Sequence, residues 1–249
     1  LGLMAGASHR VVTETSRIAM PEISIGLIPD VGATIFLNQL PYNLGYFFAL
    51  TGAQMNAKDA LFCHLADFAI QWKDHEDLIN ALKELEWQSN AETNHLLVNA
   101  LLKEKSCAPA SLPEENVVHN LVILEETCRH NSLSGLIAAI ESFDSENTWL
   151  DKAKSSLKQG SPFSSLFIYE QLKRHSYVDL QTAFTSEYTL MSNMIQHPDF
   201  IEGVRALLID KDKKPIWQYK DFTQISSSVI DSVFSARWEE HPLEKYFNE

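Results

Sequence analysis

The sequence predicts an α/β fold in its first 70 residues and a mainly helical region over residues 71–249. Two observations support this prediction. Before residue 70, short runs of β-branched and apolar residues alternate with stretches of helical periodicity. After residue 70, apolar residues recur at helical spacing, and no convincing strand pattern returns. Of the 249 residues, 45% are hydrophobic and 21% charged, so we expect a packed core rather than disorder.

The first part opens on small apolar residues and is then punctuated by proline and glycine. Residues 21–29 predict a loop with short extended pieces, in which Ile23, Ile25 and Leu27 alternate as one buried face would. Pro41 separates two helical patterns. The expected elements are, in order, a helix within 1–8, strands at 11–13 and 17–20, helices at 32–40, 43–52 and 57–65, and a strand at 66–70.

The second part is expected to consist of amphipathic helices, at 74–88, 93–105, 116–129 and 147–157. Ser161 and Pro162 predict a further helix start, with serine as N-cap and proline in the first turn. The run 199–202 is similar to a capping box, with Asp199 in place of serine or threonine. A stripe of large apolar residues at helical spacing is also expected to pack in the core. Its members are Phe184, Tyr188, Met191 and Ile195.

Composition argues against several classes of protein. Asp and Glu outnumber Lys and Arg by 33 to 20, a net charge of −13, and nucleic-acid binding needs a surplus of cations. No apolar run approaches the ~18–20 residues that span a bilayer, so no membrane partner is expected. Three widely spaced cysteines predict free thiols rather than disulfides or a zinc site. The nine histidines form no ligand pair at a metal spacing, so no metal is expected.

One segment, residues 19–32, combines acidic residues with apolar and turn-forming neighbours. It places the carboxyl groups of Glu22 and Asp30 among apolar residues, glycine and proline. A carboxyl group in apolar surroundings is desolvated, which can tune it for proton transfer or for attack on a carbonyl. The alternative is that both residues cap short helices, with Asp30 capping the helix that starts at Gly32. The pattern alone leaves both interpretations open.

Several segments together carry a family resemblance. They are residues 19–32, 43–52, 161–166, Glu187-Tyr188 and, most strongly, 197–217. In them the sequence resembles the crotonase (enoyl-CoA hydratase/isomerase) superfamily, whose members bind acyl-CoA thioesters, and most closely its 3-hydroxyisobutyryl-CoA hydrolase branch. The resemblance covers most of the chain and is loose over 71–160. It implies a crotonase-type core of ββα turns, here incomplete, whose C-terminal part with the catalytic loop is 1–70, followed by a helical region over 71–249.

Two positions discriminate within the superfamily. Hydratases similar to this chain carry one catalytic glutamate just after a Gly-Gly-Gly turn and a second in a Pro-Glu pair. Glu22 stands at the second place, and Gly2 stands at the first. Since a hydratase uses paired carboxylates to handle water and its proton, that mechanism lacks a partner here. Asp30 stands where hydratases tend to have glycine, which is the hydrolase pattern.

The resemblance implies thioester hydrolysis in valine breakdown, in which 3-hydroxyisobutyryl-CoA and water give the free hydroxy acid and CoA. Glu22 would either attack the thioester carbonyl to form a mixed anhydride or act as general base on water. Asp30 would hold the substrate hydroxyl or orient the water, and Gly2 would line the substrate site with them. No cofactor is expected, because CoA is part of the substrate.

Three lysines are candidates for contact with the phosphates of CoA: Lys211, Lys213 and Lys214. The alternative is a solvated run of charge. Arg205 is expected to pair with a nearby carboxylate rather than with CoA.

The chain opens on Leu1 in an apparent helix interior, which predicts the C-terminal part of a longer protein. In the superfamily, the backbone N–H groups that bind the thioester oxyanion lie upstream of this start. The upstream part of the same protein is therefore an expected partner, and residues 1–249 alone are expected to be nearly inactive. Whether the protein forms a homo-oligomer stays open. The compartment would be the mitochondrial matrix in a eukaryote or the cytoplasm in a bacterium.

Two alternative functions stay open. One is another crotonase-superfamily enzyme, such as an isomerase or a hydrolase of a different acyl-CoA. The other is a non-catalytic subunit that keeps the fold, although such a subunit has no need of two carboxyl groups in an apolar loop.

Overall fold

The computed structural model describes residues 1–143 and 146–247, and in it the chain divides into two compact units. The first unit contains Leu1 and residues 3–18 and 54–121, and the second contains Gly2, residues 19–53 and the chain from residue 122 onward. The units thus interleave along the sequence and do not follow the expected division into 1–70 and 71–249. The expected division separates the part that belongs to the family's core from the helical region, not two compact units, and it stays a prediction.

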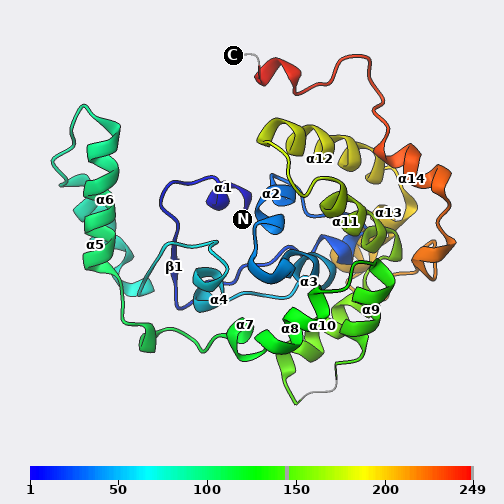
Figure 1. The fold of residues 1–249 in the computed structure, drawn as a ribbon, viewed down its shortest axis with the longest axis horizontal. Helices are drawn as coiled ribbons and strands as arrows, with labels where there is room; N and C mark the ends of the chain where they lie inside the picture. The colour runs from blue at the N-terminus through cyan, green and yellow to red at the C-terminus, as the bar shows by residue number, and fades with distance from the viewer. Residues whose placement is uncertain (144–145, 248–249) are drawn as a thin grey trace. The chain divides into compact units, whose positions relative to one another are not determined.

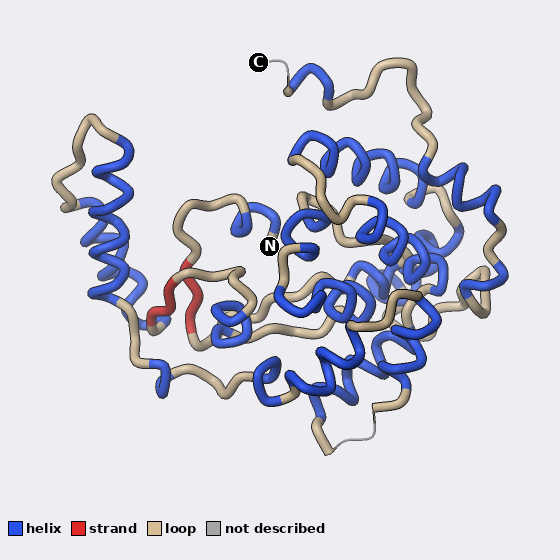
Figure 2. Tube along the Cα trace, viewed as in Figure 1, coloured by secondary structure: helices blue, strands red, loops and turns tan. Residues whose placement is uncertain are grey.

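A two-stranded parallel sheet lies in the first unit, drawn in red in Figure 2. Strand β1 (Val11–Thr13) pairs with β2 (Phe68–Ile70), with Val12 opposite Ala69. Both strands are predicted from the sequence. The strand expected at 17–20 is reduced to one antiparallel bridge between Ile18 and Met55. In the described residues no strand follows β2.

Short helices complete the first unit: α4 (Ala57–Phe62), α5 (His75–Lys83), α6 (Ala91–Lys105) and α7 (Asn116–His119). Figure 1 shows α5 and α6 side by side as a hairpin. Ile70, Leu78 and Leu102 form a buried cluster that joins this hairpin to β2. The buried carboxylate of Asp59 accepts the backbone N–H groups of Asn116 and Val117, which fixes the start of α7 against α4.

The second unit is a group of helices packed around α3 (Leu44–Thr51). Its other helices are α2 (Ala33–Asn38), α8 (Leu121–Cys128), α9 (Leu133–Glu141), α10 (Thr148–Gln159), α11 (Pro162–Arg174), α12 (Leu180–Met194), α13 (Pro198–Val204) and α14 (Ser227–Phe234). Helix α3 contacts α2, α10 and α11 (Figure 1). Among the large side chains buried here are Phe47, Phe48, Phe163 and Phe167.

Shorter helical elements connect these helices. The single turn α1 (Gly2–Ala5) opens the chain. The 3₁₀ turns are η1 (Glu22–Ile25), η2 (Pro41–Asn43), η3 (Trp72–Asp74), η4 (Pro109–Ser111), η6 (Phe222–Gln224) and η7 (Glu244–Tyr246), and η5 (Arg205–Ile209) is a π-helical turn. In the described part of the chain, no helix is both long and apolar enough for a membrane span.

Several predicted helix boundaries are wrong; the helix expected over 74–88, for example, ends at Lys83. The helix expected over 116–129 breaks at Asn120, whose backbone leaves the helical region (φ −109°, ψ 15°), so α7 and α8 are separate. The helix expected to begin at Asp199 has His197 as its N-cap, because the Asp199 side chain is committed elsewhere. Ser161 caps α11 as predicted, accepting the N–H of Ser164. Helix α9 has no counterpart in the prediction.

The apolar stripe on α12 that was expected to pack in the protein core lies to one side of the buried face of this helix. Tyr188 is 40% exposed and Ile195 is 46% exposed. The buried face carries instead Ala183, Glu187, Leu190 and Met194. Phe184 and Met191 are half-buried, so the prediction is wrong for Tyr188 and Ile195. The fully buried face differs because it includes an acidic residue, which ordinary burial rules place outside.

The three cysteines agree with the prediction of free thiols. Cys63 and Cys128 are buried, and Cys107 is half-buried. Burial raises the pKa of both buried thiols to about 12, which keeps them protonated and unreactive near neutral pH.

Candidate functional site

Residues 19–32 fold as a loop in the second unit, with η1 near its start. Gly26 ends η1 in the left-handed conformation (φ +76°), and its N–H donates to the carbonyl of Glu22. Glycine adopts this conformation at little cost, so the turn can close tightly. The Glu22 side chain therefore projects from the first residue of a short, closed helical turn.

Helix α13 approaches η1 so closely that only glycine fits at two positions. A Cβ atom on Gly26 would lie 2.6 Å from the carbonyl carbon of Asp199. A Cβ atom on Gly203 would lie 2.5 Å from the Cα of Ile25. Real Cβ atoms do not come so near backbone atoms, so these two glycines let α13 hold η1 by direct backbone packing.

A second set of contacts holds η1 through the start of α11. The Ser161 N–H donates to the carbonyl of Ile23 (3.0 Å). The Ser161 hydroxyl donates to Oδ2 of Asp199 (2.6 Å), and the N–H of Gln218 donates to the other oxygen (2.8 Å). Asp199 is fully buried, so both bonds offset the cost of desolvating its charge. η1 is thus fixed between α11 and α13.

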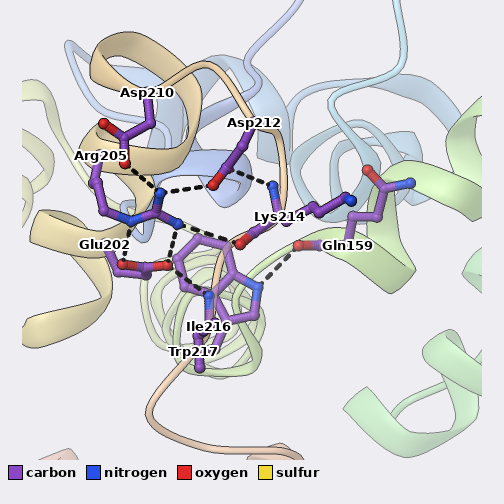
Figure 3. Close-up of polar contacts among 8 residues, drawn as sticks. All are labelled: Gln159, Glu202, Arg205, Asp210, Asp212, Lys214, Ile216 and Trp217. Atoms are coloured by element: carbon purple, nitrogen blue, oxygen red, sulfur yellow. Dashed lines mark hydrogen bonds and ion pairs between the residues drawn. The ribbon is translucent and has the colours of Figure 1, made fainter.

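Arg205 organises the segment that follows α13, as Figure 3 shows. Its guanidinium donates to both oxygens of Glu202 (2.9 and 2.8 Å). It also donates to Asp210 (2.6 Å) and Asp212 (2.7 Å). The expectation that Arg205 pairs with nearby carboxylates is therefore confirmed. A planar guanidinium can serve several acceptors at once in this way.

The same cluster turns the chain back toward α10. The N–H of Ile216 donates to Oε1 of Glu202 (2.7 Å), and the Trp217 indole donates to the carbonyl of Gln159 (2.9 Å; Figure 3). Residues 197–217, which we call the C-terminal clamp, therefore reach the C-terminal end of α10 through Trp217. The segment with the strongest family resemblance acts here by packing and hydrogen bonds that fix the loop carrying Glu22.

Glu22 is partly buried, and its Oε2 atom is enclosed without a hydrogen-bond partner among the described residues. Burial, helped by the negative charge of Asp30, raises the pKa of Glu22 to about 7. The carboxyl group therefore exchanges a proton in the neutral range. This is the behaviour required of a general base, and an unpartnered oxygen also suits a nucleophile.

Asp30 lies beyond η1 in the same loop and is partly buried. Burial raises the pKa of its carboxyl group, and its charge acts on Glu22. The structure thus places the two predicted acidic residues close enough for the charge of one to raise the pKa of the other. The carbonyl oxygen of Asp30 accepts the N–H of Ala33 (3.2 Å) at the start of α2. The side chain that caps this helix is not Asp30 but Glu187.

Gly2 lies against the residue that follows Asp30. A Cβ atom on Gly2 would lie 2.5 Å from Cγ1 of Val31 and 2.6 Å from its carbonyl oxygen. No side chain fits at Gly2 unless the loop moves. The place where a hydratase-like sequence would carry its first glutamate is therefore closed by Val31.

The three candidate lysines lie on the loop after η5. The N–H of Lys213 donates to the carbonyl of Ala206 (3.0 Å), and that of Lys214 to Asp212 (2.9 Å), so the backbone of this loop is fixed. The Lys214 side chain extends away from the Arg205 guanidinium in Figure 3. In the described residues these lysines make no hydrogen bond or ion pair with Glu22 or Asp30.

The sequence analysis gave Glu187 no role. It lies on α12, only 2% exposed, and accepts the backbone N–H groups of Gly32 (2.7 Å) and Thr34 (2.8 Å). The available signal was its spacing: Glu187 lies four residues after Ala183 and three before Leu190. An acidic residue on an apolar helix face needs a buried partner, and that requirement could have singled it out.

Comparison with solved structures defines the class of fold. An enoyl-CoA hydratase from Rhodobacter sphaeroides 2.4.1 matches with a TM-score of 0.75 and 30% identity, covering 94% of this chain and 63% of its own. A carnitinyl-CoA dehydratase from Mycobacterium thermoresistibile matches with a TM-score of 0.81 and 25% identity, covering 98% and 66%. The chain has a crotonase-type fold, with an incomplete core followed by a helical region.

The family follows from the sequence comparison. The family model described as enoyl-CoA hydratase/isomerase matches residues 1–234, and the chain belongs to this family. A mitochondrial 3-hydroxyisobutyryl-CoA hydrolase from Dictyostelium discoideum is 32% identical over 94% of this chain. The protein of the same description from Danio rerio is 33% identical over 95%. The chain spans about 60% of the length of these curated relatives.

Proposed function

We propose that the full-length protein hydrolyses a short 3-hydroxyacyl-CoA thioester, with 3-hydroxyisobutyryl-CoA as substrate, in valine breakdown. The observation that carries the proposal is the enclosed Oε2 of Glu22, which has no partner in the described residues. Burial, helped by the charge of Asp30, raises the pKa of this group to about 7. The names of the relatives support the same reaction. In it, water cleaves the bond between the acyl carbon and sulfur and gives the hydroxy acid and CoA.

Glu22 can act in either of two ways. As a nucleophile, its carboxylate attacks the thioester carbonyl, expels the CoA thiolate and forms a mixed anhydride that water then cleaves. As a general base, it takes a proton from the water that attacks the same carbon. Asp30 would hold the 3-hydroxyl group of the substrate or orient the water. One turnover in ¹⁸O-labelled water separates the routes, because only the anhydride can place label in the Glu22 carboxylate.

Two alternatives are less compatible with the site. A hydratase would need a second carboxylate at Gly2, where Val31 leaves no room for a side chain. A non-catalytic subunit would gain nothing from Glu22, since a desolvated carboxyl group without a partner for Oε2 lowers stability. Hydrolysis needs no carboxylate at Gly2, and it gives the desolvated carboxyl group of Glu22 a function that explains its cost in stability.

We also propose that Lys211, Lys213 and Lys214 bind the phosphates of CoA. Asp210 and Asp212 are both bonded to Arg205, so the clamp engages the acidic groups nearest to these lysines. Replacing all three lysines by alanine should raise KM for acyl-CoA and leave kcat nearly unchanged. An unchanged KM would leave them as a solvated run. Because the relatives named above are described as mitochondrial, we expect the matrix as the location in a eukaryotic host.

The test of the proposed function uses the full-length protein and a thiol reagent that reports free CoA. Wild-type protein, Glu22→Gln and Asp30→Asn are compared on 3-hydroxyisobutyryl-CoA, isobutyryl-CoA and an enoyl-CoA. We expect CoA release from the hydroxyacyl thioester, and its loss in Glu22→Gln. Hydration of the enoyl-CoA without CoA release would contradict the proposal and favour a hydratase. No turnover of any acyl-CoA would favour a non-catalytic subunit.

A further inference from the structure

The turn between Asp30 and α2 has an unfavourable backbone conformation. Val31 has φ +58°, in the left-handed region, and Gly32 follows with φ +85°. Glycine adopts such angles freely, but a β-branched residue does so rarely, because its Cβ crowds the backbone. A turn of this kind persists only when neighbouring groups hold it. Within the loop, the N–H of Ala33 donates to the Asp30 carbonyl (3.2 Å). Since α2 has only six residues and Gly32 offers no capping side chain, the turn needs a further restraint from outside the loop.

Glu187 supplies this restraint from α12. One carboxylate oxygen accepts the N–H of Gly32 (2.7 Å), and the other accepts the N–H of Thr34 (2.8 Å). The carboxylate thus spans the peptide groups just after Val31. Because Glu187 is 2% exposed, water does not replace these bonds readily. A charged acceptor makes stronger bonds to backbone N–H groups than a neutral one.

A second contact between the same elements provides a comparison. The amide of Gln171 on α11 donates to the Thr34 hydroxyl (2.9 Å), and the Ser186 hydroxyl donates to the Gln171 carbonyl (2.9 Å). This route reaches only the side chain of Thr34. Of the two routes, the Glu187 bonds alone reach the peptide that follows Val31.

We infer that Glu187 is a positioning residue that holds Asp30 in place by fixing the Asp30–Val31–Gly32 turn from α12. Without the bond to Gly32, Val31 can return to an ordinary backbone angle. Asp30 immediately precedes Val31, so its carboxylate would then leave the position from which its charge acts on Glu22. The role of Asp30 toward substrate or water rests on the proposed function, whereas the restraint of the turn does not.

The test is a double-mutant cycle in the full-length protein with Glu187→Gln and Asp30→Asn. We expect Glu187→Gln to lower kcat by about tenfold to a hundredfold, as misplacement of a group at the site does. Inhibition by free CoA should be unchanged, because Asp30 is not expected to contribute to the binding of CoA. In the Asp30→Asn background, Glu187→Gln should lower kcat by less than about twofold, since residues that act through one another are not additive. Equal losses in both backgrounds would overturn the inference, and so would an unchanged kcat.

Ser186→Ala is the matched control, because it removes the neighbouring bond on the same helix and leaves both backbone bonds of Glu187 intact. Its kcat is expected to stay within about twofold of wild type. If Glu187→Gln does not fold, Glu187→Asp enters the same cycle. It keeps the charge, but its side chain is one methylene shorter, so the carboxylate does not reach the N–H groups of Gly32 and Thr34 from the same place on α12.

A crystal structure of Glu187→Gln, or of Glu187→Asp in its place, separates this inference from the proposed function. We expect Val31 to leave the left-handed region and the Asp30 carboxylate to move away from Glu22. A turn that keeps its wild-type backbone overturns the inference, whatever the wild-type protein hydrolyses. A wild-type protein that does not cleave 3-hydroxyisobutyryl-CoA overturns the proposed function but leaves this measurement valid.

Discussion

Glu22→Gln is expected to make the protein less active and, above neutral pH, more stable. Burial raises the pKa of Glu22 from 4.5 to about 7. Below pH 4.5 the group is protonated in the folded and unfolded states, and no stability is lost. As the pH rises toward 7, the unfolded state ionises first, so the folded state loses stability relative to it. At 1.36 kcal/mol per pKa unit, the full loss is about 3 kcal/mol.

The assay is urea unfolding of the full-length protein at several values between pH 4 and pH 8. The free energy of unfolding of Glu22→Gln, minus that of the wild type, should increase by about 3 kcal/mol across this range. Comparing pH values cancels any constant effect of the buried amide. The control Glu84→Gln changes an exposed glutamate, so its difference should stay nearly flat. A flat difference for Glu22→Gln, or one that falls with pH, would refute the reasoning.

Three further exchanges test the environment of Glu22. Asp30→Asn removes a negative charge that raises the pKa of Glu22, so the acidic limb of the residual pH profile of kcat/KM should move to lower pH. A limb that does not move would show that the charge of Asp30 has no effect on the pKa of Glu22. Gly2→Ala places a Cβ 2.5 Å from Val31, so it should destabilise the protein by about 1–3 kcal/mol in urea unfolding, and Val31→Gly should restore part of that loss. A lysine at position 205 cannot bind three carboxylates at once, so Arg205→Lys should lower Tm. The decrease should be smaller at high salt, which screens these ion pairs. An unchanged Tm would show that the cluster does not contribute to stability.

The sequence predicts the parts of the site that depend on local order. Glu22 and Asp30 are eight positions apart in one loop, and the glycines and prolines around them predict that the loop turns sharply. Strands β1 and β2 and the start of α11 are predicted for the same reason, since their signals lie within a few residues. The pairing of Arg205 also needs only its neighbours.

The packing of α12 could not be predicted in this way. Two neighbouring faces of this helix have helical spacing, and the one with Phe184 and Tyr188 is the more apolar. The structure buries the other face, because the bonds from Gly32 and Thr34 offset the cost of desolvating Glu187. Those donors lie 155 and 153 positions away in the chain. No periodicity carries that information, so the wrong prediction for the stripe and the missed role of Glu187 have one cause.

Hydrogen bonding, rather than burial, separates the roles of the two glutamates. Burial raises the pKa of both. Glu187 commits each oxygen to a backbone N–H, and these bonds lower its pKa against the effect of burial. Taking up a proton or attacking a carbonyl would break them. In the described residues Oε2 of Glu22 has no such partner, so its lone pairs remain available for water or a thioester.

The two glutamine variants should therefore change stability in opposite directions at pH 8. Glu187→Gln turns an NH₂ group toward a backbone N–H and should lose about 1–3 kcal/mol, as other buried donors left unpaired do. Glu22→Gln removes a desolvated charge and should gain stability. Urea midpoints that move in the same direction for both variants would show that the two carboxylates are not distinguished by their hydrogen bonds.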